Sequence, residues 1–148
     1  MPTRKARTAW DGGLQDGSGQ VELSSSRLGT FTVSFPKRAA DEDDGSVTTP
    51  EELLAASHSS CYAMALAGQI GAAGGTPISH EVTADVTLGA DPDGGFKISS
   101  IHMTVRAEVE GLDSDGFRVA AENAKAGCPI SKALAATPIT LDAALETA

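Results

Sequence analysis

The sequence predicts an α+β fold in which antiparallel sheets pack around one long central helix, in the order βββ-α-ββ-αα-β. The helix is indicated by a stretch from Leu53 to Ala73 that has no proline, only two glycines and alanine as its commonest residue. Short segments of alternating apolar and polar residues precede it, and two longer ones follow it around a strong turn. Strands grouped before and after a helix are typical of the α+β class. A length of 148 residues suits a single domain spanning 1–148.

We expect three short strands before the helix, over residues 3–10, 19–25 and 31–35. Val21 and Leu23 alternate with polar residues in the second strand, and Pro36 is expected to end the third. The polar segment 37–48 follows and carries the acidic run 41–44. This run lacks the spacing of a calcium-binding EF-hand loop, so we interpret it as a solvated loop.

The long helix is expected to begin at Pro50. Thr49 can cap it, Pro50 suits the first helical position, and Glu51 and Glu52 complement the positive end of the helix dipole. Apolar side chains occur on every face, which predicts a helix buried on most sides. Its length of about 24 residues, or roughly 36 Å, could cross a membrane. Its charged and hydroxyl-bearing residues argue against that.

The segments after the helix complete the predicted fold. Residues 80–88 and 96–110 form a hairpin around the turn at 91–95. Asp113 can cap a helix over about 114–126. We expect the inward-facing residues of that helix to be Phe117, Ala120, Ala121 and Ala124. A short helix around 131–136 and a last strand over 139–143 follow.

Composition limits the classes of partner. The net charge is −9 and no basic stripe is present, so we expect no nucleic acid and no membrane as a partner. The first residues form no apolar signal-peptide core, which predicts a cytoplasmic protein. In a reducing compartment the two cysteines are then catalytic, redox-active or inert rather than a permanent disulfide. No paired CxxC or HxxxH spacing indicates a metal, and we expect no bound cofactor.

Two cysteines and a histidine are the candidates for chemistry. Cys61 lies in the middle of the long helix, where a cysteine is most simply a small buried hydrophobe. Cys128 stands between a glycine and a proline at a helix start, where the dipole stabilises a thiolate. Spacing alone does not say whether the two sulfurs meet. His58, three residues before Cys61, could act as a base or be a hydrogen-bonded core histidine.

Two segments resemble a known family. Residues 50–61, PEELLAASHSSC, closely resemble the PEEL-AA-H-C motif of the OsmC/Ohr family of organic hydroperoxide reductases. Residues 124–134, AKAGCPISKAL, resemble that family's AK-CP-S-L segment. The similarity extends from Trp10-Asp11-Gly12 to Ile139-Thr140-Leu141, and the first of these, with Ser57-His58, is closer to the OsmC branch.

The resemblance implies specific roles for site residues. It implies that Cys61 is the peroxidatic cysteine and Cys128 the resolving cysteine. The two would form a disulfide during the catalytic cycle. An arginine before the helix pairs with Glu51. We assign that role to Arg38, because Phe35-Pro36-Lys37-Arg38 resembles a Phe-Pro-basic-Arg segment of relatives, with Lys37 as the second candidate. In other relatives the arginine falls where this chain has Ser34.

The resemblance also implies partners. The family forms intertwined homodimers with active sites at the interface, and an external dithiol, a lipoylated protein by resemblance, reduces the disulfide. Glu51 and Cys61 are ten residues apart on the expected helix, or roughly 15 Å along its axis. Glu51 is therefore expected to serve Cys61 of the other chain. The small apolar neighbours of Cys61 suit alkyl or lipid hydroperoxides.

Two other classes of function remain open from the sequence. One is a non-catalytic stress-response or ligand-binding homologue with an unreactive Cys61. The other is a cysteine hydrolase that uses His58 as its base.

Overall fold

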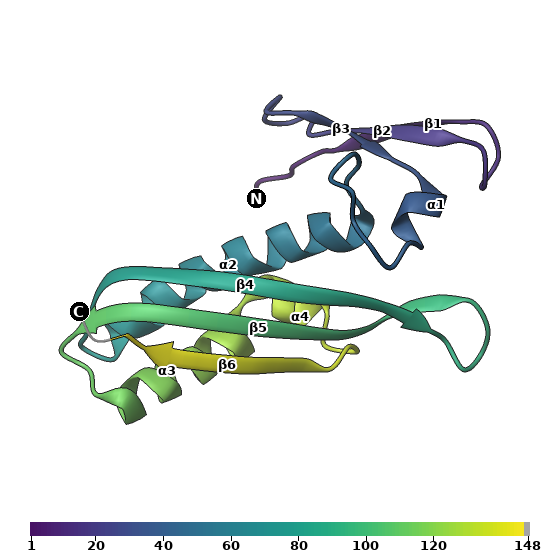
Figure 1. Ribbon diagram of the computed structural model, residues 1–148. Coiled ribbons are helices and arrows are strands. Elements are labelled where there is room, and N and C mark those ends of the chain that lie inside the picture. The colour runs from purple at the N-terminus through teal and green to yellow at the C-terminus, as the bar shows by residue number, and fades with distance from the viewer. Residues whose placement is uncertain (147–148) are drawn as a thin grey trace. The chain divides into compact units, whose positions relative to one another are not determined.

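The computed structural model describes residues 1–146 and divides into two compact units. The N-terminal unit is Met1–Leu53 and the C-terminal unit is Leu54–Ala148. Each contains a three-stranded sheet, and the long helix begins in the first unit and continues into the second. The α+β class is confirmed (Figure 1). The single domain over 1–148 stays a prediction.

The N-terminal unit is built on the antiparallel sheet β1-β2-β3. Its strands are β1 (Arg7–Asp11), β2 (Ser18–Glu22) and β3 (Thr30–Val33), each shorter than expected. Gly19 pairs with Trp10 on one side and with Val33 on the other. A Cβ at Gly19 would lie 2.9 Å from the Trp10 ring and 3.1 Å from a Val33 methyl. The absence of a side chain at Gly19 therefore lets Trp10 and Val33 approach each other across the sheet.

A short helix, α1 (Phe35–Arg38), replaces the expected end of the third strand. We expected the strand to reach Phe35 and a loop to begin after Pro36. The strand ends at Val33 instead, because the fixed φ of a proline fits the first turn of a helix. The backbone N–H of Arg38 donates to the Ser34 carbonyl at 3.0 Å. Arg38 is thus the last residue of a helical turn rather than part of a loop.

Helix α2 (Pro50–Ala72) confirms the long helix and its cap. The backbone N–H of Glu52 donates to the Thr49 hydroxyl at 3.1 Å, which is the hydrogen bond expected of a capping threonine. Downstream, one stripe at four-residue spacing is buried: His58, Tyr62, Leu66 and Ile70. Met64 is 75% exposed. The expectation that the helix is buried on most sides is therefore wrong for the single chain.

The second sheet has the order β4-β5-β6 and belongs to the C-terminal unit. Strands β4 (Thr76–Ala90) and β5 (Phe96–Glu110) form the expected antiparallel hairpin. Strand β6 (Ile139–Leu145) pairs parallel with β5, so this sheet is mixed and not purely antiparallel. Parallel neighbours need a crossover, and α3 (Ser114–Gly127) and α4 (Pro129–Ala133) supply it. The crossover returns the chain to the end of the sheet where β5 began.

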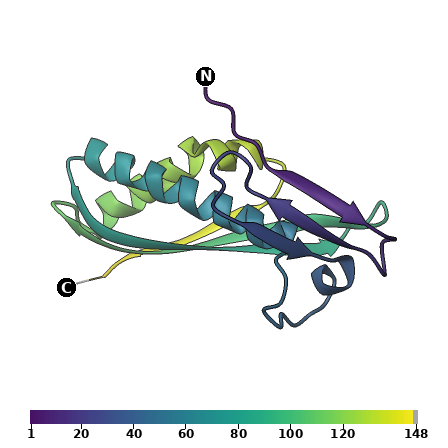
Figure 2. The same cartoon turned by 90° about the horizontal axis from the view of Figure 1, so that it is seen from above.

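The core of the C-terminal unit lies between its sheet and two helices. Helices α2 and α3 lie on the same face of the sheet (Figures 1 and 2). Asp113 caps α3 by accepting from the Gly116 N–H at 2.8 Å, as predicted. The four α3 residues expected to face inward are all buried, and with α2 and β5 they form one cluster: Tyr62, Leu66, Ile70, Ile101, Met103, Val105, Ala107, Phe117, Ala120, Ala121, Ala124 and Cys128. A cysteine of the candidate site is thus part of the core.

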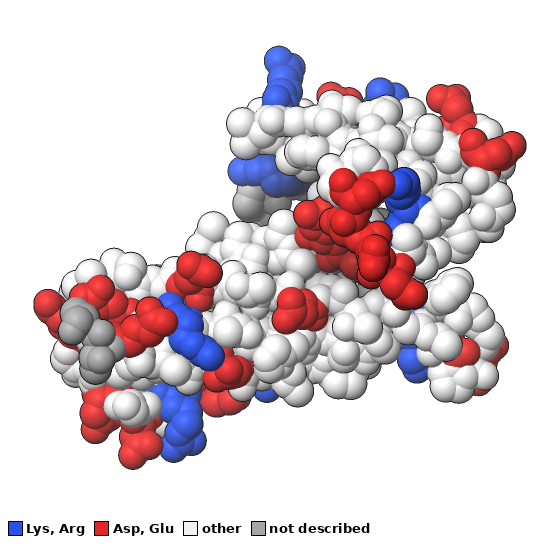
Figure 3. Space-filling model, viewed as in Figure 1, with Lys and Arg blue, Asp and Glu red and all other residues white. Residues whose placement is uncertain are grey.

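The surface agrees with the acidic composition. The face in Figure 3 mixes acidic and basic side chains, and no broad basic patch is visible on it. None of the helices within residues 1–146 combines the length and the apolar character that crossing a membrane requires. Among the same residues, no cluster of three or more histidine, cysteine or acidic side chains could hold a metal ion.

Candidate active site

The structure brings the two cysteines together. Cys61 lies in α2, and Cys128 is the residue that caps the N-terminus of α4. Their sulfur atoms are 3.1 Å apart, and both are free thiols. Cys128 is fully buried, whereas Cys61 is partly exposed. A reagent from solution therefore meets Cys61 first, while Cys128 lies within reach of the same sulfur.

Helix periodicity explains why these sulfurs meet. Residues three apart share one face of a helix, and both helices here use that spacing. On α2 the pair is His58 and Cys61, and at the start of α4 it is Cys128 and Ser131. His58 Nε2 lies 2.7 Å from Ser131 Oγ, so a second contact joins the same two helices as the contact between the sulfurs. Two polar contacts therefore fix the register of α4 against α2.

The two sulfurs have opposite electrostatic surroundings. Burial raises the pKa of Cys61, and the neighbouring Cys128 adds to the rise, although the Ile130 N–H opposes it. Burial also raises the pKa of Cys128, but the Ser131 N–H, the Cys61 thiol and the Ser131 hydroxyl outweigh it, so the net shift is downward. Because the two sulfurs lie within hydrogen-bond distance, ionisation of one thiol affects the other and the two titrate as a pair. Within the C-terminal unit the negative charge is better stabilised on Cys128, and no cation lowers the pKa of Cys61.

A second pair of site residues, Arg38 and Glu51, meets within the N-terminal unit. Arg38 Nε lies 3.0 and 3.2 Å from the two carboxylate oxygens of Glu51, and Nη2 lies 2.7 Å from Oε1. Glu51 is in the first turn of α2 and only 8% exposed. This forked geometry fixes the plane of the guanidinium and leaves Nη1 free of Glu51. Arg38 thus pairs with Glu51 as the resemblance implied, and the catalytic role of the pair stays a prediction.

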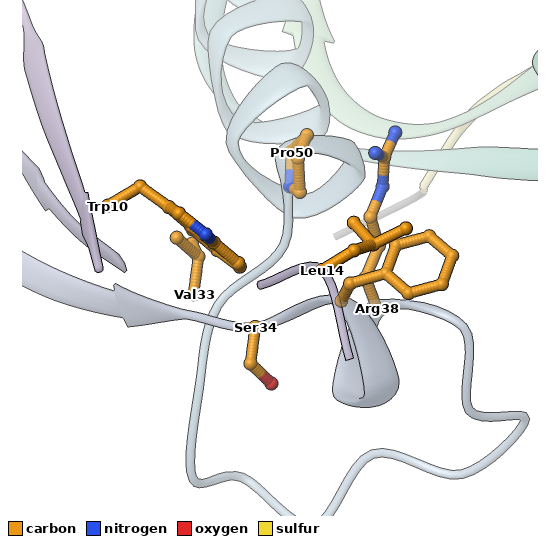
Figure 4. Close-up of a pocket in the computed structure, with 7 residues that line it drawn as sticks. Trp10, Leu14, Val33, Ser34, Arg38 and Pro50 are labelled. Atoms are coloured by element: carbon orange, nitrogen blue, oxygen red, sulfur yellow. The ribbon is translucent and has the colours of Figure 1, made fainter. Parts of the chain in front are cut away.

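The other candidates for the cation have different surroundings. Lys37 binds the carboxylate of Asp44 in the loop after α1, and both side chains are about half exposed. Ser34 precedes α1, and its hydroxyl points away from the other labelled side chains (Figure 4). Arg38 is thus the basic residue of this segment that a glutamate of α2 holds in place.

An apolar pocket of about 220 Å³ adjoins Arg38 (Figure 4). Its lining comes entirely from the N-terminal unit: Trp10, Leu14, Val33, Ser34, Phe35, Arg38 and Pro50. Sequence reasoning missed this pocket, because its residues are scattered over β1, the turn after β1, β3, the segment that leads into α1, α1 itself and the start of α2. The exposure of large apolar side chains such as Trp10 and Leu14 appears only in the folded chain.

His58 contacts Ser131 and not the sulfur of Cys61, so it is not placed to act as a base for Cys61. Its ring is fully buried and its Nε2 contacts Ser131, so the interpretation as a hydrogen-bonded core histidine is confirmed. Burial lowers its pKa and keeps the ring neutral. Ser131, which contacts His58 and stabilises Cys128, was not singled out from the sequence. Its place three residues after Cys128 was the available signal.

Comparisons with known proteins identify the family of this chain. Residues 43–143 match the family described as OsmC-like protein. The chain is 39% identical to peroxiredoxin OsmC of Escherichia coli (strain K12) over 144 residues, which is 97% of each chain. It is 30% identical to organic hydroperoxide resistance protein OhrA of Bacillus subtilis (strain 168) over 127 residues, or 85% of each.

A solved structure shares the architecture. An organic hydroperoxide resistance protein from Elizabethkingia anophelis superposes with a TM-score of 0.77 at 25% identity, covering 98% of this chain and 99% of the other. The family match, the sequence identities and the shared fold agree, and the chain belongs to the OsmC-like protein family.

Proposed function

We propose that this protein is a thiol peroxidase that reduces organic hydroperoxides to alcohols. The 3.1 Å contact between a partly exposed Cys61 and a buried Cys128 carries the proposal, because the first sulfur can be oxidised and the second can resolve it. The names of the relatives, a peroxiredoxin and organic hydroperoxide resistance proteins, support the same chemistry.

The first step is attack by the Cys61 thiolate on the distal oxygen of the hydroperoxide. The O–O bond breaks, Cys61 becomes a sulfenic acid, and the alkoxide takes a proton to leave as the alcohol. In the second step the Cys128 thiolate attacks the Cys61 sulfur, forming the disulfide and releasing hydroxide, which becomes water on protonation. An external dithiol, a lipoylated protein in the cell, then exchanges with the disulfide and restores both thiols.

Arg38 supplies the positive charge that this chemistry needs. No cation of the C-terminal unit lowers the pKa of Cys61, so its thiolate requires one from elsewhere. Arg38, held by Glu51, keeps Nη1 free for a thiolate or for the developing alkoxide. The apolar pocket beside Arg38 suits the alkyl group of the substrate better than it suits hydrogen peroxide.

The active form is a homodimer whose sites each take residues from two chains. Glu51 and Cys61 are ten residues apart on α2, which separates their α-carbons by roughly 15 Å along the helix axis. A glutamate side chain is too short to span that distance. Met64 lies on the same helix and is 75% exposed, and a second chain would cover this apolar side chain. Arg38 and Glu51 of one chain would then serve Cys61 of the other.

Peroxide consumption with lipoamide as the reductant tests this function. Cumene hydroperoxide and tert-butyl hydroperoxide should be consumed faster than hydrogen peroxide, and the Cys61→Ser variant should consume none. If the unmodified protein fails to consume any of the three peroxides with lipoamide or dithiothreitol, the chain is a non-catalytic member of its family. Hydrolysis of a thioester or ester at Cys61 would instead indicate a hydrolase.

A further inference from the structure

Two large apolar side chains of the pocket beside Arg38 stay exposed in the folded chain. Trp10 is 41% exposed and Leu14 is 59% exposed, and both line the pocket within the N-terminal unit. Figure 4 shows Trp10 on one side of this pocket and Leu14, with Arg38, on the other. A hydrocarbon group that enters the pocket would remove part of both side chains from water, which favours binding.

Trp10 is held in place from two directions. Its indole N–H donates to the carbonyl of Gly12 at 3.0 Å. Its ring lies against Gly19, where a Cβ would come within 2.9 Å of the ring carbon Cε3. The exposed part of the ring is therefore an apolar wall that is already positioned before a ligand arrives, so binding costs little ordering of this side chain.

The turn that carries Leu14 is closed by contacts among its own residues. The Gly17 N–H donates to the Gly13 carbonyl at 2.8 Å, and the Gly13 N–H donates to a carboxylate oxygen of Asp16 at 2.9 Å. A Cβ at Gly17 would lie 2.4 Å from the Gly13 carbonyl oxygen and 2.5 Å from that of Asp11, so the turn closes this tightly only with glycine there. None of these contacts uses the side chain of Leu14, which is left free to meet a ligand.

The size of the pocket indicates which hydrocarbon group fits it. An apolar cavity on the order of 150 Å³ is enough to hold benzene. The pocket here, of about 220 Å³, is large enough for a phenyl group with a few further carbons, as in cumene hydroperoxide. Among the lining residues of the described chain only Arg38 is charged, so the peroxide oxygens belong at that end.

We propose that Leu14 is a specificity-determining residue that covers the hydrocarbon part of the hydroperoxide against Trp10. This inference rests on the proposed peroxidase function. The peroxide oxygens lie near Arg38, and the hydrocarbon group lies between the indole ring and the Leu14 side chain. Hydrogen peroxide has no hydrocarbon group to cover, so Leu14 favours organic hydroperoxides over it.

Fluorescence of Trp10 tests the binding step without turnover, because Trp10 is the only tryptophan of the chain. Cumyl alcohol, the product of cumene hydroperoxide reduction, should change the emission of the reduced protein in a saturable way. Leu14→Ala should raise the Kd about fivefold, because apolar contact is lost from a side chain that is 59% exposed before binding. Leu14→Met keeps the size and apolar character and should stay within about twofold. Leu14→Asn is similar in size but polar, and should bind as weakly as Leu14→Ala.

A second exposed leucine provides the matched control. Leu28 is 84% exposed in the segment between β2 and β3 of the same sheet and does not line the pocket. Leu28→Ala should therefore leave the Kd for cumyl alcohol unchanged. If Leu28→Ala raises this Kd as far as Leu14→Ala does, the effect is not local to the pocket and the proposal is wrong. It is equally wrong if cumyl alcohol gives no saturable change in the unmodified protein.

Substrate preference then tests the consequence for turnover. With dithiothreitol as the reductant, the measured quantity is the ratio of kcat/KM for cumene hydroperoxide to kcat/KM for hydrogen peroxide. Leu14→Ala should lower this ratio about fivefold, mainly by raising the KM for cumene hydroperoxide, and Leu28→Ala should not change it. An unchanged ratio in Leu14→Ala would overturn the proposal, and weaker self-association of that variant would then identify Leu14 as a contact between two copies of the chain. No turnover of any peroxide would refute the peroxidase function, while the fluorescence titration would still decide whether Leu14 holds the hydrocarbon group.

Discussion

Replacing Glu51 by glutamine separates the position of Arg38 from its charge. The carboxylate makes three short contacts to the guanidinium, of 2.7, 3.0 and 3.2 Å. A hydrogen bond to a charged partner contributes about 1.5–3 kcal/mol when buried. The Arg38 side chain is 34% exposed, so solvent screening reduces this to about 1–2 kcal/mol for the lost geometry. That is a fall of about 5- to 30-fold in kcat/KM.

The pKa of Cys61 distinguishes the two effects of the arginine. Glu51→Gln keeps the positive charge, so kcat/KM should fall while the pKa of Cys61 does not rise. Arg38→Ala removes the charge, so the pKa should rise and kcat/KM should fall at least tenfold. Turnover of cumene hydroperoxide with dithiothreitol gives the rate. The pH dependence of iodoacetamide labelling, in a Cys128→Ser background, gives the pKa of Cys61.

The double variant and a neighbouring lysine complete this experiment. If Glu51 acts only through Arg38, then Arg38→Ala combined with Glu51→Gln should be no slower than Arg38→Ala alone. Lys37→Ala is the matched control, because Lys37 binds an exposed aspartate, Asp44. A further loss of similar size in the double variant would refute the idea that Glu51 works through the arginine. A rate that depends on Lys37 and not on Arg38 would refute the assignment of the cation.

Three further outcomes are expected. Cys128→Ser should allow one oxidation and then accumulate over-oxidised Cys61, seen by mass spectrometry; faster oxidation of Cys128 than of Cys61 would reverse their roles. Heterodimers of Glu51→Ala and Cys61→Ser chains should recover about half of one dimer's activity, and inactive heterodimers of folded chains would show that Glu51 serves its own chain. Asp113→Ala should lower the free energy of unfolding by about 1 kcal/mol in urea, because the Gly116 N–H loses its cap; no change would mean that the cap contributes nothing.

The elements that the sequence predicted well were those with strong local signals. The hairpin strand Phe96–Glu110 and the capped helix α3 matched because alternation, turn residues and Asp113 all act within a few residues. Helix α1 was missed because four residues give too short a pattern, and Pro36 suits both the end of a strand and the start of a helix. The parallel pairing of β6 was missed because it depends on a connection through two helices.

The candidate site was predictable to a similar degree. Motif resemblance indicated the residue pairs, and the structure brings Cys61 to Cys128 and Arg38 to Glu51. The contact between His58 and Ser131 could not be predicted, since it joins two helices that are 73 residues apart in sequence at that point. The pocket beside Arg38 likewise needs folding to assemble residues from separate segments.

The parallel strand β6 has a consequence for the order in which the chain can fold during synthesis. The sheet of the C-terminal unit gains its third strand only from residues Ile139–Leu145, although both cysteines are made earlier. Apolar residues of that strand pack against the core that contains Cys128. On a ribosome, the nascent chain therefore carries both thiols before the core that shields Cys128 can close. Oxidation of the thiols at that stage would occur without the burial that distinguishes them in the folded protein.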